Sequence, residues 1–133
     1  MNSFTKDLVS WIENNLDNNI FLDKVSEKSG YSKWHLQRIF KAETKINLAS
    51  YVRQRRLSKA AIMLKMTSVL VCDISDYLGF STQQTFTRTF TRHFGIAPGK
   101  YRMQEDWHFQ GITSDLRLEK KSDLVPELVF LGT

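Results

Sequence analysis

Two short segments carry side chains of the types that contact base edges in DNA. Glutamine can pair bidentately with adenine and arginine with guanine, and the apolar atoms of tryptophan can pack on a thymine methyl. In both segments these residues recur three and four positions apart, which places them on one face of a helix. The predicted base-reading residues are Trp34, Gln37, Arg38, Gln83, Gln84, Thr85 and Arg88.

The opposite faces of these helices must supply the core. Leu36 and Phe40 lie on the apolar side of the first helix, and Phe86 and Phe90 on that of the second, predicted from about 82 to 93. Ser32 is the predicted N-cap of the first helix, because its hydroxyl can accept from a free amide of the first turn. Another role for Gln84 stays open, since Ser81 and Gln84 match the S-x-x-Q capping box.

An internal repeat places each segment in the same local structure. "VSEKSGYS" (25–32) matches "ISDYLGFS" (74–81) at an offset of 49, and the offset becomes 50 beyond that point. The extra residue is predicted at the start of the second helix. Each copy reads as a short helix, a turn with glycine and a longer helix, which is the pattern of a helix-turn-helix.

The charge distribution favours a polyanionic partner. Residues 24–102 hold fifteen Lys and Arg against four Asp and Glu, a net charge of +11, whereas each flank carries −3. A basic stretch of this kind suits duplex DNA.

Other functions have little support in the sequence. His35, His93 and His108 are far apart and no metal-ligand cluster or phosphate-binding loop occurs, so we expect no enzyme activity, no metal and no cofactor. The single Cys72 fits a reducing cytoplasm. The sequence has no apolar run long enough to cross a membrane and no signal peptide, which predicts a soluble protein.

The elements add up to an all-α fold with about seven helices. A linker helix over 48–65, roughly 27 Å long, joins helix-turn-helix subdomains at 1–47 and 66–106. The tail, 107–133, is expected to form short strands or to be disordered. Two helices on one face of B-DNA should lie about 34 Å apart, so the shorter linker suggests that the DNA bends toward the protein.

Four motifs carry a family resemblance: "SGYSKWHLQRIFK", "YVRQRRLSKAA", "STQQTFTRTF" and "GIAPGKYR". Over about residues 4–106 the chain resembles the AraC/XylS family of bacterial transcription regulators, and most closely its MarA, SoxS and Rob group. The resemblance implies a monomeric activator in the bacterial cytoplasm, associated with the nucleoid. It would set two helices into successive major-groove segments of promoter DNA, contact RNA polymerase and control antibiotic-resistance or stress genes. The implied phosphate-binding residues are Lys33, Lys41, Arg53, Arg55, Arg56, Lys59 and Arg92.

Two alternatives stay open. A repressor or architectural protein would share the DNA-binding surface but lack the polymerase contact. A protein-interaction module would show no salt-dependent binding to duplex DNA.

Overall fold

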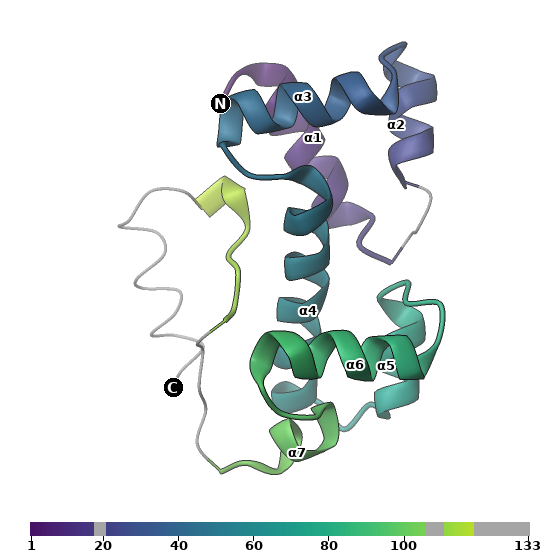
Figure 1. The fold of residues 1–133 in the computed structure, drawn as a ribbon, viewed down its shortest axis with the longest axis vertical. Helices are drawn as coiled ribbons and strands as arrows, with labels where there is room; N and C mark the ends of the chain where they lie inside the picture. The colour runs from purple at the N-terminus through teal and green to yellow at the C-terminus, as the bar shows by residue number, and fades with distance from the viewer. Residues whose placement is uncertain (18–20, 106–110, 119–133) are drawn as a thin grey trace.

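The computed structural model describes residues 1–17, 21–105 and 111–118, and the regular secondary structure in these residues is all helical, without a strand. The prediction of an all-α fold is therefore confirmed (Figure 1). The helices are α1 Ser3–Asn14, α2 Phe21–Ser29, α3 Lys33–Thr44, α4 Leu48–Met66, α5 Val71–Tyr77, α6 Gln83–Phe94 and α7 Pro98–Met103, with a 3-10 turn, η1, at Leu116–Leu118.

The long helix α4 is the axis of the molecule. Its start is fixed by Asn47, whose side chain accepts a hydrogen bond from the amide of Ser50. Figure 1 shows α3 lying across one end of α4 and α6 across the other, roughly parallel to each other. The fold therefore holds two equivalent helices at a separation set by α4.

Each end of α4 belongs to its own hydrophobic core. The first core contains Leu8, Val9, Ile12, Leu16, Phe40, Leu48, Tyr51 and Val52. The second contains Leu57, Ala60, Ala61, Leu64, Ile74, Leu78, Phe86, Phe90 and Tyr101. The apolar residues of α4 thus change sides along its length, which fits a helix that packs against two different bodies.

The repeat is visible in how each short helix is tied to the helix that follows it. The hydroxyl of Ser26 in α2 donates to the carbonyl of Tyr31 at 2.6 Å, and that of Ser75 in α5 donates to the carbonyl of Thr82 at 3.3 Å. Both bonds cross the turn and end just before the next helix. They hold α3 and α6 at their angles to α2 and α5.

The prediction of an extra residue at the start of the second helix is wrong. Both α3 and α6 have 12 residues. The extra residue lies in the turn before α6, which has two residues between Gly79 and the N-cap Thr82, whereas only one separates Gly30 from Ser32. The two helices therefore present surfaces of equal length.

After α7, which ends at Met103, the described chain resumes as a segment that runs alongside α4 (Figure 1). We call residues 111–117 the strap. The strap contains the start of η1 and no strand, so the expected short strands are absent there. The rest of the predicted tail, 107–110 and 119–133, lies outside the described residues.

Candidate nucleic-acid interface

One face of α3 presents the polar residues that its sequence singled out. Ser32 caps the helix by accepting from the amide of His35 at 3.1 Å, while Leu36 and Phe40 are fully buried. Trp34 on the other side is 63% exposed, which is unusual for so large an apolar ring. A shallow groove runs along this surface, lined by Trp34, Gln37, Arg38, Lys41, Ala42, Asn47 and Leu48.

The exposed tryptophan orients an arginine. The guanidinium carbon of Arg38 lies 4.7 Å from the centre of the Trp34 ring, a cation–π stack between residues one turn apart. A stacked guanidinium keeps its hydrogen-bonding edge free and has fewer rotamers to lose on binding. Trp34 can therefore hold Arg38 ready for a planar, bidentate acceptor.

The start of α6 decides between the two roles left open for Gln84. The N-cap is Thr82, whose hydroxyl accepts from the amide of Thr85 at 3.0 Å, so the alternative capping box of Ser81 with Gln84 does not form. Gln84 is exposed in the first turn of the helix. Gln84 therefore has no capping role, and its side chain is available at the surface.

On α6 the structure brings together three of the predicted residues and adds a fourth. Gln83, Gln84 and Arg88 line one groove with Thr87, which the sequence reasoning missed although it lies four residues after Gln83. Thr85 faces a different groove. The helical spacing of Thr87 was the signal that could have identified it.

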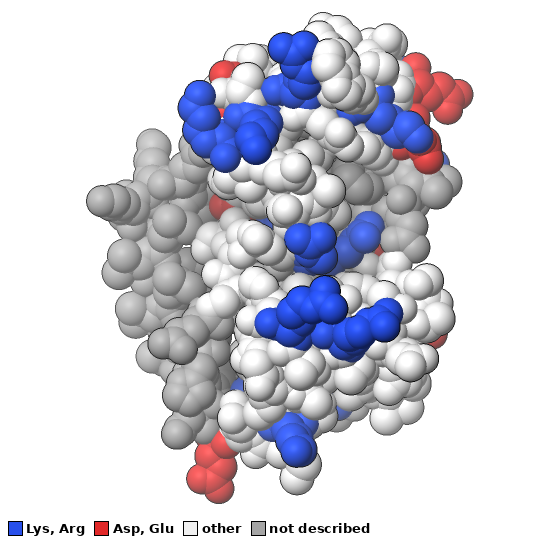
Figure 2. Space-filling view, in the orientation of Figure 1, with Lys and Arg blue, Asp and Glu red and all other residues white. Residues whose placement is uncertain are grey.

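The groove that Thr85 faces runs between the two helices and over α4. It is lined by Leu22, Gln37, Leu48, Ala49, Val52, Arg53, Arg56, Phe80, Thr85 and Thr89. Gln37 also lines the groove along α3, so the two surfaces are continuous. Figure 2 shows Lys and Arg gathered over α3, over α4 and over α6 on this one face, with Asp and Glu near its edges.

The predicted phosphate-binding residues separate into groups. Lys41, Arg53 and Arg92 are exposed. Lys33 is also exposed, and its ammonium pairs with Asp23 at 2.6 Å. Lys59 is half-buried. An exposed ion pair contributes little to stability, so Lys33 could exchange Asp23 for a phosphate at small cost.

Arg56 makes a structural contact and also lines the groove between α3 and α6, which we call the central groove. Its Nε donates to the carbonyl of Leu16 at 2.8 Å, and burial lowers its pKa.

The structure gives Arg55 a different role from the predicted one. Its side chain is only 14% exposed and makes two hydrogen bonds of 2.8 Å to the carboxylate of Glu13, which is 8% exposed. It also donates to the carbonyl of Thr113. Burial acts to lower the pKa of Arg55, but the hydrogen bonds and charge of Glu13 outweigh it and the pKa is raised. We therefore leave Arg55 out of the interface.

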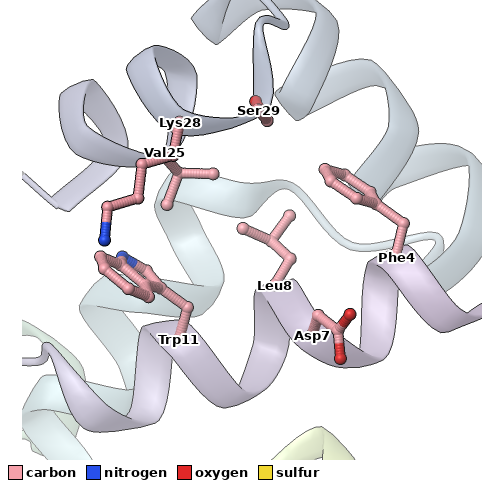
Figure 3. Close-up of a pocket in the computed structure, with 7 residues that line it drawn as sticks. All are labelled: Phe4, Asp7, Leu8, Trp11, Val25, Lys28 and Ser29. Carbon is pink, nitrogen blue, oxygen red and sulfur yellow. The ribbon is translucent and has the colours of Figure 1, made fainter.

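A separate apolar cleft lies between α1 and α2 (Figure 3). The side chains of Leu8 and Val25 face each other across it, and the Lys28 ammonium lies 4.9 Å from the centre of the Trp11 ring. None of the predicted DNA-contacting residues lines it.

The histidines are not brought together. The ring of His35 packs 5.0 Å from that of Tyr31, and His93 pairs through Nε2 with the carbonyl of Gly111 at 2.6 Å. His108 lies outside the described residues. Where the structure describes the chain, no three His, Cys, Asp or Glu residues gather as metal ligands, and no helix is long and apolar enough to cross a membrane.

The fold agrees with two solved structures. The C-terminal domain of AraT, a response regulator from Geobacillus stearothermophilus, matches with a TM-score of 0.71 and 25% identity, covering 82% of this chain and 96% of that one. The DNA-binding domain of AdpA, solved in complex with a target DNA, matches in fold with a TM-score of 0.67 at 19% identity, covering 74% and 88% of the two chains.

Sequence comparison gives the family. Residues 25–104 match a helix-turn-helix domain family. The chain is 44% identical over 126 residues to the transcriptional regulator Rob of Salmonella typhimurium, covering 95% of this chain but 43% of that protein, so it spans less than half of this relative. It is 48% identical over 96 residues to the multiple antibiotic resistance protein MarA of Escherichia coli, covering 72% of this chain and 76% of MarA. With this family match and these relatives, the chain belongs to the AraC/XylS family of transcription regulators, in the group that includes MarA and Rob.

Proposed function

We propose that the protein is a sequence-specific transcription activator that inserts α3 and α6 into successive major-groove segments of promoter DNA and recruits RNA polymerase. It acts as a monomer in the bacterial cytoplasm, at the nucleoid, and its targets are multidrug-resistance or stress genes. The name of MarA among its relatives supports the choice of genes. The proposal includes no catalytic role.

One observation carries this proposal: two roughly parallel helices, α3 and α6, expose arginine and glutamine side chains on the same basic face (Figure 1 and Figure 2). Arg38 and Gln37 lie on α3. On α6, Arg88 lies at the position that matches Arg38, and Gln84 lies at the position that matches Trp34. A folding role does not account for these residues, because the opposite faces of both helices supply the cores. Arginine and glutamine suit the acceptor and donor patterns of guanine and adenine in the major groove.

The central groove between the helices suits the phosphates that separate two major-groove segments. Arg53 and Arg56 line it from α4, close to Thr85 of α6. The 19 residues of α4 extend about 28 Å, less than the roughly 34 Å of one DNA turn. We therefore propose that the DNA bends toward this face, at a cost of a few kcal/mol. A circular-permutation mobility assay that finds a straight site would contradict the bend.

The first test is binding to a duplex that carries a site of the MarA and Rob type, compared with scrambled DNA, at several salt concentrations. Arg38→Ala and Arg88→Ala should each lose about 1–3 kcal/mol on the specific site and little on scrambled DNA. Lys6→Ala, an exposed charge on α1, is the matched control and should change neither. If neither arginine variant loses affinity for the specific site, the alternative of a protein-interaction module is favoured instead.

The second test separates an activator from a repressor or an architectural protein. Purified RNA polymerase transcribes a promoter with the site upstream, with and without the protein. An activator raises transcript output above the basal level, and Arg38→Ala abolishes the increase. Output that stays level or falls while the site is occupied would reject activation and keep DNA binding.

A further inference from the structure

The strap is hydrogen-bonded along one side of α4 at three successive turns. The amide of Leu116 donates to the Tyr51 hydroxyl at 2.9 Å. The amide of Thr113 donates to the hydroxyl of Ser58 at 2.7 Å. Between these points Arg55 donates to the Thr113 carbonyl. Positions 51, 55 and 58 follow the i, i+4, i+7 spacing of one helix face, so the strap lies parallel to the helix axis.

The two ends of the strap reach both cores. Leu116 packs against the first core and Ile112 against the second. At Gly111 the carbonyl pairs with His93 in the last turn of α6. At the other end η1 packs against α1. The strap is therefore a second connection between the body that carries α3 and the body that carries α6, beside α4.

The side chains of α4 that hydrogen-bond the strap are buried or mostly buried polar groups. Ser58 is fully buried, and the Tyr51 side chain lies within the first core. Burial raises the pKa of the Tyr51 phenol. The bidentate pair of Arg55 with Glu13 links α1 to the same point. Buried donors and acceptors are costly to leave unpaired, so these bonds hold the strap in a single position.

A second connection matters because a single helix bends easily on the scale that DNA recognition requires. A bend of about 10° at the middle of α4 would move one of its ends by about 2–3 Å. That displacement is close to the rise of about 3.4 Å between base pairs. A strap fixed along one side of α4 resists such a bend.

We propose that the strap sets the distance between α3 and α6, and with it the half-site spacing that the protein accepts in DNA. Tyr51, Arg55 and Ser58 are positioning residues, since they act on DNA only through the placement of the two helices. The inference rests on the proposed DNA-binding function.

The test uses the full chain and three duplexes: one with the preferred spacing, one with a base pair inserted between the half-sites and one with a base pair removed. An inserted pair moves one half-site about 3.4 Å along the axis and turns it by about 35°. The variant Tyr51→Phe with Ser58→Ala removes the acceptors of both strap amides. Ile74→Val, a change at a fully buried residue of α5, is the control for a general loss of stability.

The wild type and Ile74→Val should prefer the correct spacing strongly. In the double variant this preference, as a ratio of dissociation constants, should fall by about fivefold or more, the effect of about 1 kcal/mol. A ratio equal to that of the wild type would overturn the inference. If the double variant does not fold, Tyr51→Phe alone and Arg55→Lys replace it with the same readout.

The two failures can be told apart. A wild type that does not distinguish the site from scrambled DNA overturns the proposed function, and the spacing inference falls with it. A wild type that recognises the site but tolerates every spacing overturns the spacing inference alone.

Discussion

Arg53 and Arg55 are two residues apart on α4, yet their replacement should affect different properties. Replacing Arg55 should lower the stability of the fold, and replacing Arg53 should change the salt dependence of DNA binding. Arg55→Met leaves the carboxylate of Glu13 buried, at 8% exposure, without its bidentate partner. Breaking a buried pair in this way costs about 3–5 kcal/mol, a large part of the roughly 5–15 kcal/mol that stabilises a domain. The melting temperature should fall by about 10–20 °C. Below its melting temperature, the Arg55→Met variant should bind DNA with the same salt dependence as the wild type.

Arg53→Met should leave the stability unchanged and make DNA binding less dependent on salt. Arg53 is exposed, and its contact is a long 3.5 Å bond to the Ser50 hydroxyl, so the melting temperature should stay within about 2 °C. If Arg53 neutralises one phosphate, the slope of log K against log salt should become shallower by about 0.9. Thermal denaturation and fluorescence anisotropy at four salt concentrations measure both quantities for both variants.

A third variant separates the effect of the unpaired Glu13 carboxylate from the loss of the Arg55 side chain. Arg55→Met combined with Glu13→Leu removes both charges and should recover a substantial part of the lost stability, because no unpaired carboxylate remains. The reasoning is refuted if Arg55→Met costs less than about 1 kcal/mol and also lowers the salt slope. That outcome would mean that Arg55 faces DNA and that the pair with Glu13 is weak.

Three further outcomes follow from individual contacts. Trp34→Ala and Arg38→Ala, measured singly and together by DNA-binding anisotropy, should couple by about 0.5–1 kcal/mol through their stack, and strict additivity would argue against it. Burial raises the pKa of Tyr51, so its share of stability is complete below about pH 10 and declines as the pH rises above it, by up to about 1.4 kcal/mol per unit. Chemical denaturation of Tyr51→Phe should show a flatter alkaline decline, and an unchanged slope would contradict this. Thr82→Ala should cost about 1 kcal/mol of unfolding free energy, whereas Ser81→Ala should cost almost nothing, and the reverse order would restore Ser81 as the cap.

Helical spacing was sufficient to predict what faces the core and what faces solvent. The angle between Trp34 and Leu36 predicted an exposed tryptophan, and the structure has Trp34 at 63% exposure. The linker helix predicted over 48–65 is found as Leu48–Met66. Both predictions rest on residues within a few turns of each other, where the period of the helix alone decides the geometry.

What the sequence could not supply were partners far along the chain. The family resemblance implies that Arg53 and Arg55 both bind phosphates, although about 200° of helix rotation separates them. That angle could have placed Arg55 on the other side of α4, but its partners, Glu13 and Thr113, are 42 and 58 residues away. The N-cap of α6 could not be chosen from the sequence for a local reason. Ser81 and Thr82 both suit the N-cap position, and the repeat alone did not show which turn contains the extra residue.

The change of sides along α4 has a consequence for folding. Tyr51 and Val52 are buried in one core, and Leu57 and Leu64 in the other. If either body opens, half of α4 loses the packing that keeps it helical, because a segment of that length is marginal in water on its own. The two bodies should therefore unfold as one cooperative unit, with the slowest amide exchange along the middle of α4. A protein built in this way cannot lose α3 to local unfolding and keep α6, or the reverse.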